Sequence, residues 1–164
     1  MALLGNIIWF LLGGWLLFLL YTLGAILFFP VFVPIFRIAK YSLFPFGKGI
    51  VTQNQLTKYR ELTASESEGD AASQVAGTTK TVAQGVSGVL NILWMITFGW
   101  VLAFVHLLAS FANLLLFFMI ITIPNIGGHW KMMKIAFLPF NKVIVPKKLS
   151  EEIEIEIAKG KLNL

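Results

Sequence analysis

The sequence contains no cysteine and few charged residues. The absence of cysteine among its 164 residues excludes disulfides, thiolate metal sites and cysteine nucleophiles. Charged residues make up 13% of the chain, whereas an ordinary soluble domain has about 25%. Hydrophobic residues make up 57%, and a chain this short buries too little surface to hide them. An ordinary soluble globular protein is therefore excluded, and lipid must form part of the solvent.

Two long stretches, residues 1–36 and 81–130, contain no Asp, Glu, Lys or Arg. A membrane-spanning helix needs about 20 mainly apolar residues. The longer stretch has room for two spans, and the shorter one has room for one comfortable span or two short ones. The sequence therefore predicts an all-α, multi-pass membrane protein with four short spans or, alternatively, three.

All the basic residues lie outside these two stretches, and the net charge is +5. Both charged blocks are basic, and positively charged loops stay on the cytoplasmic side of a membrane. We therefore expect both blocks to face the cytoplasm. We interpret their charge as directed at anionic phospholipid, with no nucleic acid as partner.

The two apolar stretches resemble each other. Residues 6–15 match residues 91–100 at an offset of 85, which aligns an Asn, an Ile, two Trp and a Gly. Residues 30–51 match residues 124–145 at an offset of 94, which aligns a Pro, three basic positions and a Pro-Phe pair. Hydrophobic composition alone does not readily produce such matches, so the pattern predicts an internal duplication.

Because both copies end in a basic motif on the same side, we expect parallel repeats, each folded as a helical hairpin. In the first copy each helix would be about 25 Å long, which is shorter than the roughly 30 Å hydrocarbon core. Such helices would have to thin the bilayer or form a re-entrant hairpin. A single long first helix is the alternative.

The end of the first copy reads Arg37-Ile-Ala-Lys-Tyr-Ser-Leu-Phe-Pro45-Phe-Gly-Lys48-Gly-Ile-Val51. With the preceding Asn-Ile-x-Trp and Gly-Trp, this motif resembles the YccF family of bacterial inner-membrane proteins. The resemblance covers residues 3–51 and 88–146, and Asn141 replaces the expected Gly in the second copy. It implies a multi-pass protein of the bacterial inner (plasma) membrane, without an assigned reaction.

The expected organisation is a first YccF-like repeat (1–51), a flexible cytoplasmic linker (52–87), a second repeat (88–146) and a cytoplasmic tail (147–164). Residues 62–89 are rich in Ser, Ala, Gly, Thr and Gln, which is typical of a linker. Residues 35–44 and 129–138 are predicted to be interfacial helices.

Three short segments outside the apolar stretches are predicted to form a small cytoplasmic β element. Residues 49–53 and 142–146 are rich in β-branched side chains. Residues 152–157 alternate Glu and Ile, which favours a strand over an amphipathic helix.

No acidic residue lies in the apolar stretches, so they hold neither a Ser-His-acid set nor a histidine-carboxylate metal motif. We therefore predict no enzymatic activity, no metal and no cofactor.

The candidate site residues are polar groups at membrane depth, interfacial aromatics and basic residues. His106 is either a proton-sensitive group or, as we favour, a neutral side chain bonded to a neighbouring helix. Asn6 and Asn91 either line a pathway or, as we favour, hydrogen-bond between helices. The pathway or interhelical polar set is Asn6, Asn91, His106 and Asn113. An interfacial aromatic belt is predicted from Trp9, Trp15, Trp94, Trp100 and Trp130. Lipid headgroups are expected at Arg37, Lys40, Lys48, Lys131, Lys134 and Lys142.

Two functions follow from this composition. The first is a homo-oligomer that provides an ion or small-solute pathway. The alternative is a non-conducting scaffold or accessory protein that binds anionic lipid or a partner through its basic cytoplasmic face.

Overall fold

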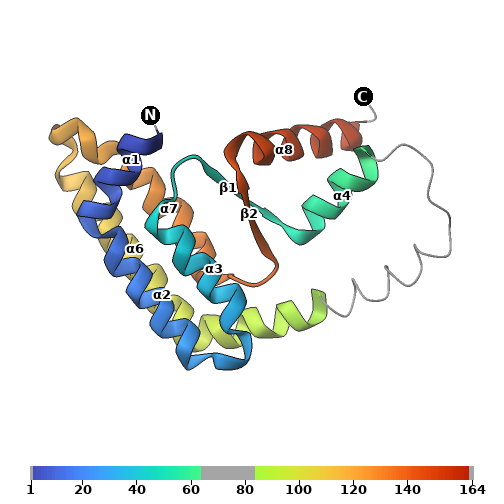
Figure 1. Cartoon of the computed structure of the whole chain (residues 1–164), viewed down its shortest axis with the longest axis horizontal. Coiled ribbons are helices and arrows are strands. Elements are labelled where there is room, and N and C mark those ends of the chain that lie inside the picture. Colours follow the sequence, from blue (N-terminus) through green and yellow to red (C-terminus); the bar gives the residue numbers. More distant parts are fainter. Residues whose placement is uncertain (1, 64–83, 163–164) are drawn as a thin grey trace. The chain divides into compact units, whose positions relative to one another are not determined.

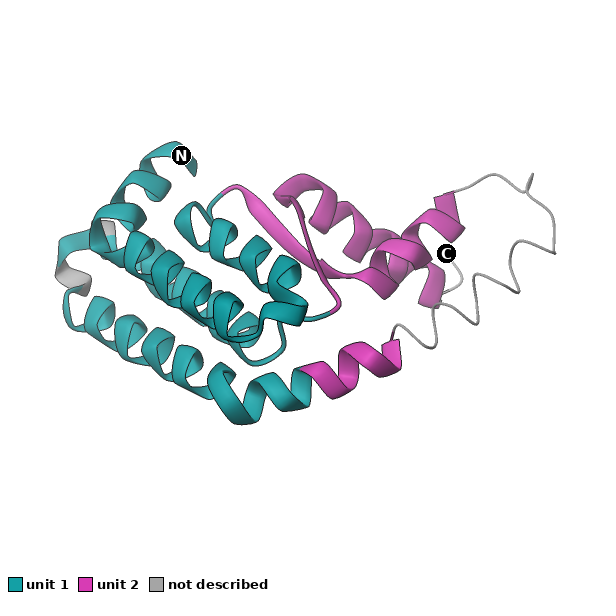
Figure 2. Ribbon diagram, turned by 60° about the horizontal axis from the view of Figure 1, so that its bottom comes forward, with its two compact units in different colours: residues 1–46, 91–140 teal, residues 47–90, 141–164 magenta. Residues whose placement is uncertain are grey.

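The computed structural model describes residues 2–63 and 84–162, which are mostly helical and include one small sheet (Figure 1). The chain divides into two compact units (Figure 2). Unit 1 consists of Met1–Phe46 and Asn91–Phe140, and unit 2 of Gly47–Leu90 and Asn141–Leu164. The apolar stretches thus supply unit 1, and the charged segments supply most of unit 2.

The first half of unit 1 is a helical hairpin. Its long arm consists of α1 (Ala2–Trp9), a π turn (Phe10–Gly14) and α2 (Trp15–Leu27). After a short turn at Phe29–Val31, α3 (Phe32–Leu43) returns along α2. The long arm bends at Gly13, whose φ of 129° is a conformation that only glycine adopts without strain. The helix stops before Pro30 because proline has no N–H to continue the hydrogen-bond ladder.

The second half of unit 1 is a hairpin of the same kind. Residues 84–94 are helical and continue through a π turn (Met95–Gly99) into α6 (Trp100–Leu115). A turn at Phe117–Thr122 leads to α7 (Ile123–Phe137), which packs along α6. By length and composition alone, two helices of the described residues could each cross a membrane, Ala2–Leu27 and Gln84–Leu115. The fold is thus helical with two candidate spans.

The two hairpins run in opposite directions, so the prediction of parallel repeats is wrong for these helices. In Figure 1, α2 descends while α6 rises. Trp94, near the start of the second long arm, packs against Phe28, at the end of the first, with ring centroids 5.1 Å apart. The prediction assumed that, because both copies end in a basic motif on the same side of the membrane, their helices must run in the same direction. In the antiparallel arrangement the end of the first long arm lies beside the start of the second.

In unit 2, β1 (Lys48–Thr52) pairs antiparallel with β2 (Lys142–Pro146), and Ile50 lies opposite Ile144. Both strands were predicted to within a residue. The turn before β1 has Gly47 at φ 84°, and the equivalent turn before β2 has Asn141 at φ 64°. Asn tolerates the left-handed region better than most residues, so the replacement of Gly by Asn preserves the turn.

The expected third strand is absent, because residues 152–157 lie within helix α8 (Lys147–Leu162). A helix places Ile153 and Ile157 on one face, where both are buried with Val51 and Val145. Salt bridges at helical spacing, Lys147–Glu151 and Lys159–Glu156, support the same conformation. The strict alternation was therefore misleading.

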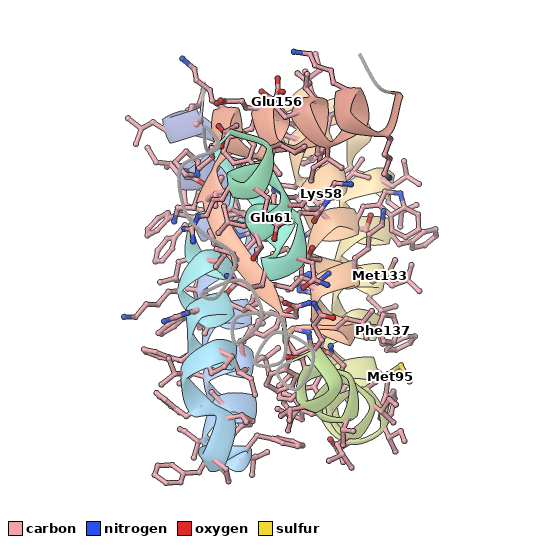
Figure 3. The ribbon with its side chains drawn as sticks, turned by 90° about the vertical axis from the view of Figure 1, so that its right-hand side faces the viewer. Lys58, Glu61, Met95, Met133, Phe137 and Glu156 are labelled. Carbon is pink, nitrogen blue, oxygen red and sulfur yellow. The ribbon has the colours of Figure 1, made fainter. Side chains whose placement is uncertain are left out.

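Part of the expected linker, residues 52–87, is helical. Helix α4 (Gln53–Thr63) covers its first part, and the chain is helical again from Gln84. Residues 64–83 lie outside the described residues. The α4 and α8 helices carry charged side chains, among them Lys58, Glu61 and Glu156 (Figure 3).

Candidate functional site: a buried tyrosine–histidine chain in unit 1

Three polar side chains form a hydrogen-bonded chain inside unit 1. The Tyr21 Oη lies 3.1 Å from Nε2 of His106, and Nδ1 of His106 lies 3.1 Å from Nδ1 of His129. The residues come from α2, α6 and α7, and all three side chains are buried. The chain therefore links the two hairpins through their interior.

The helical spacing of the sequence explains why these groups point inward. His106, Ser110 and Asn113 lie at i, i+4 and i+7 on α6, and Asn125 and His129 lie at i and i+4 on α7. Residues at these spacings share one helix face. All five side chains are buried, so the facing sides of α6 and α7 form a polar stripe.

The hydrogen-bond donors and acceptors available to the three side chains indicate where the protons of the chain lie. A neutral imidazole has one donor and one acceptor nitrogen. If the Tyr21 hydroxyl donates to Nε2 of His106, then Nδ1–H of His106 donates to Nδ1 of His129. In this direction the Tyr21 hydroxyl proton and the Nδ1–H of His106 each have an acceptor, and we adopt it. Burial lowers the pKa of His129 to about 4, so its ring is neutral at pH 7.

The two ring nitrogens of His106 thus bond to side chains of α2 and α7. Tyr21, His129 and Asn125 were not among the predicted site residues. A signal for Tyr21 was present, because His106 follows it at the same offset of 85 that relates the two apolar stretches. No comparable signal marked His129, whose counterpart at the offset of 94 is Ile35.

Asn113 and Asn125, the two asparagines of the polar stripe, differ in their partners. Asn113 donates to the Ala109 carbonyl at 2.8 Å, within its own helix. Asn125, which was not predicted, is buried, and neither its Nδ2 nor its Oδ1 has a hydrogen-bond partner. A buried amide without partners costs free energy. Asn125 is therefore the group of the stripe that is open to a polar ligand.

Asn6 and Asn91 each close the base of a hairpin. Asn6 accepts from the Phe46 N–H at 2.9 Å and donates to the Phe46 carbonyl at 3.1 Å. Asn91 makes the equivalent bonds with Phe140, at 3.0 and 3.4 Å. We refer to Asn6 with Phe46 as the first base and to Asn91 with Phe140 as the second base. Both amides are used within the chain, where they join the long arm to the turn after the return helix.

The prediction of an aromatic belt does not fit two of its five tryptophans. Trp9 and Trp94 are at most 1% exposed. The Trp9 Nε1–H donates to the Ser42 carbonyl at 2.7 Å, and that of Trp94 donates to the Ala136 carbonyl at 2.8 Å. A glycine five residues later, Gly14 or Gly99, leaves room for each indole. These two tryptophans hold the hairpins together internally.

The other three tryptophans, Trp15, Trp100 and Trp130, are 48–55% exposed. Two of them are on the long arms and one is on α7. Their exposed rings can reach an interface between water and lipid.

The basic side chains predicted for lipid headgroups divide between the units. On α3 and α7, Arg37, Lys40 and Lys134 are exposed, and Lys131 is half-buried. The Lys40 ammonium lies 4.9 Å from the Phe36 ring centroid, and that of Lys131 lies 5.7 Å from the Tyr41 centroid. Trp130, Lys131, Met133 and Lys134 line a surface cavity of about 520 Å³. Lys48 and Lys142 are half-buried on the strands of unit 2, and burial lowers the pKa of Lys142.

Within residues 2–63 and 84–162, no group of three His, Cys, Asp or Glu side chains could hold a metal ion. The two histidines of the buried chain have each other, Tyr21 and the Trp9 ring as neighbours, with the Trp9 and His129 centroids 4.4 Å apart. The three side chains form a continuous hydrogen-bonded chain, which offers no carboxylate for acid–base chemistry.

Comparison with known proteins agrees with the sequence motif. The YccF family, described as "Inner membrane component domain", matches residues 4–48 and 89–142. The chain is 31% identical over 147 residues to "Inner membrane protein YccF" of Escherichia coli (strain K12), covering 85% of this chain and 84% of that protein. The protein of the same name from Shigella flexneri matches to the same extent. No solved structure matches the chain. On the family match and this identity, the chain belongs to the YccF family of inner membrane proteins.

Proposed function

We propose that this inner membrane protein is a non-conducting scaffold that binds anionic phospholipid through its return helices. A pattern shared by α3 and α7 carries the proposal: an aromatic residue, a base beside it and a second base three residues later. The pattern consists of Phe36, Arg37 and Lys40 on α3 and of Trp130, Lys131 and Lys134 on α7. The three residues of α7, with Met133, line the 520 Å³ surface cavity.

The chemistry of these side chains suits a phospholipid headgroup. Ammonium and guanidinium groups attract the phosphate, and an exposed indole such as that of Trp130 is stable at headgroup depth. Each base near an anionic surface contributes about 1 kcal/mol to membrane binding. Four such bases therefore give a strong preference for anionic over zwitterionic lipid.

The test compares lipid retention after purification in mild detergent. The variant replaces Arg37, Lys40, Lys131 and Lys134 with Gln, and a control of equal charge change replaces Lys58, Arg60, Lys148 and Lys161 in unit 2. We expect native mass spectrometry to show loss of anionic lipid from the first variant and retention by the control. Equal retention by both variants, with helix content unchanged, would contradict the proposal.

We also propose that the protein has no enzymatic activity and needs no cofactor. The histidines are bonded to each other and to a tyrosine, and the described carboxylates lie on α4 and α8 in unit 2. A general acid–base pair requires such groups to converge within hydrogen-bond reach. Turnover of any substrate that depended on His106 or His129 would overturn this proposal.

We further propose that the two hairpins arose by duplication. Contacts that recur at equivalent positions support it: Asn6 with Phe46 and Asn91 with Phe140, and Trp9 with Ser42 and Trp94 with Ala136. The family match falls in two segments that correspond to these hairpins. Similar losses of stability for Asn6→Leu and Asn91→Leu would agree with equivalent roles.

A second candidate function is a homo-oligomer with an ion or small-solute pathway. The buried chain from Tyr21 to His129 and the unpartnered Asn125 favour it, because a hydrogen-bonded chain can relay protons and an open amide can bind a permeating species. A monomeric mass in lipid nanodiscs would remove this candidate. If an oligomer forms, proteoliposomes should show proton or ion flux that His106→Leu abolishes and Asn91→Leu leaves unchanged.

A further inference from the structure

Both hairpin bases continue directly into the paired strands. Phe46 of the first base is followed by Gly47 and Lys48 of β1, and Phe140 of the second base by Asn141 and Lys142 of β2. The two strands pair with each other, and the polar helices α4 and α8 follow them in the chain. An open two-stranded sheet does not occur in hydrocarbon, since its edge N–H and C=O groups need water. Both bases therefore lie at the same aqueous face of the membrane.

The tip of the first hairpin also lies at that face. Trp94 is three residues from Asn91, and its ring centroid is 6.5 Å from that of Phe140 in the second base. The same ring is 5.1 Å from Phe28, which begins the tip of the first hairpin. A tip that packs on Trp94, beside the second base, cannot lie on the far side of the bilayer. The first hairpin thus has its base and its tip at one face.

The length of the hairpin then fixes its direction. Asn6 and Phe28 are separated by 22 residues of almost continuous helix, which is about 33 Å at 1.5 Å per residue. A rod of that length with both ends at one membrane face lies along the face and does not cross it. Because the second hairpin runs antiparallel to the first, the same holds for it.

The basic residues of the return helices point the same way. Arg37 is nine residues, or about 13 Å, from the first base. In a spanning hairpin it would lie near the middle of the roughly 30 Å hydrocarbon core, where charged side chains are rare and costly. Lys131 occupies the equivalent place on α7. If the helices lie along the membrane, these basic side chains stay at headgroup level.

The long arms have the surface that this orientation requires. Their exposed side chains include Leu4, Leu11, Leu19 and Ile26 on the first arm and Ile96, Phe104, Phe111 and Leu115 on the second. The opposite face of α2, with Leu17, Tyr21 and Ala25, is buried in the protein. The exposed apolar side chains of the long arms can therefore lie among the acyl chains of one leaflet, while the opposite face of α2 is covered by protein.

We propose that neither hairpin crosses the membrane and that the protein is embedded in one leaflet. The outer faces of the two long arms lie among the acyl chains, and the basic side chains of α3 and α7 lie at headgroup level. This proposal goes beyond the scaffold function and does not depend on a preference for anionic lipid.

Depth measurements along the first long arm test the proposal. The chain has no cysteine, so single cysteines at Leu4, Leu11, Leu19 and Ile26 can each carry a nitroxide without further changes. Collisional accessibility to oxygen and to a water-soluble nickel chelate gives the depth of each label in proteoliposomes. We expect the four depths to agree within about 5 Å, as for a helix 5–10 Å into the interface. Depths that pass through the bilayer centre at Leu11 or Leu19 would overturn the proposal.

The side on which the tip lies provides a second test. Phe29→Cys at the tip is 77% exposed, and Ala158→Cys on α8 marks the aqueous side of unit 2. A membrane-impermeant maleimide is added to right-side-out and inside-out membrane vesicles that contain the full chain. Labelling of the tip from the same side as Ala158→Cys, or from neither side, supports the proposal. Labelling from the opposite side overturns it. If the four label depths agree but the protein shows no preference for anionic lipid, only the proposed scaffold function would be contradicted.

Discussion

The Tyr21 hydroxyl lies 3.1 Å from Nε2 of His106, and the two residues are 85 positions apart, the offset that aligns residues 6–15 with 91–100. Ile50 and Ile144, which are aligned at the offset of 94, lie opposite each other in the sheet. If the hairpins arose by the proposed duplication, Tyr21 and His106 are equivalent residues that contact each other close to a two-fold axis of unit 1. At such an axis identical side chains would meet, and the tyrosine–histidine pair instead supplies a donor and an acceptor.

The first prediction compares two buried tyrosines. Tyr21→Phe removes the partner of His106 Nε2 and should destabilise the protein by about 1–3 kcal/mol. Tyr41 is equally buried, and its hydroxyl has no partner among the described residues. Tyr41→Phe should therefore be neutral or slightly stabilising. Denaturant unfolding in detergent, followed by tryptophan fluorescence, measures both, and equal effects would refute the hydrogen bond's importance.

The second prediction concerns pH. Burial lowers the pKa of His129 to about 4, below the unfolded value of about 6.5. Between these pH values the unfolded state therefore binds more protons than the folded state. The free energy of unfolding should be highest above pH 6.5 and should fall towards pH 4. The shift corresponds to a loss of at most about 3 kcal/mol. Unfolding free energies from pH 4 to 8 should show this slope.

The matched variant for the pH dependence is His129→Gln, whose amide oxygen can still accept from His106 Nδ1. Glutamine does not titrate, so the variant should lose less stability between pH 6.5 and 4 than the natural protein. A slope identical to that of the natural protein would show that His129 is not the group responsible.

The third prediction uses two adjacent glycines of α7. A Cβ at Gly128 would lie 2.6 Å from Cζ3 of Trp9, whereas a Cβ at Gly127 would meet nothing within 4 Å. Gly128→Ala should destabilise the protein by about 1–3 kcal/mol through overpacking. Gly127→Ala should stabilise it by about 0.5–1 kcal/mol, because alanine loses less entropy in a helix. A neutral Gly128→Ala would contradict the packing of Trp9 on α7.

Local patterns in the sequence predicted the elements well, because they depend on near neighbours. The charge-free stretches predicted apolar helices, and Pro45 and Pro139 follow the ends of α3 and α7. Gly47 and Asn141 both have a positive φ at the turns before the two strands. The strands 48–52 and 142–146 were also found from their β-branched side chains.

The relative direction of the hairpins could not be read from the sequence, because it depends on contacts between distant residues. The packing of Trp94 on Phe28 and the stacking of Trp9 on His129 are examples. Of the polar stripe, His106 and Asn113 were among the predicted site residues, whereas Ser110, Asn125 and His129 were not. Ser110, Asn113, Asn125 and His129 correspond to Ala25, Phe28, Val31 and Ile35.

The last prediction distinguishes helix from strand in the C-terminal segment. Ile153 is fully buried in the core of unit 2, whereas Ile155 is 54% exposed. A strand would place Ile153, Ile155 and Ile157 on one face, and truncation of Ile153 or Ile155 would then cost similar free energy. In the helix α8, Ile153→Ala should cost about 2–5 kcal/mol through loss of buried surface, and Ile155→Ala should cost almost nothing. Amide hydrogen exchange in β1 and α8 reports on unit 2 directly. Equal acceleration of exchange by the two variants would mean that the alternating segment is a strand after all.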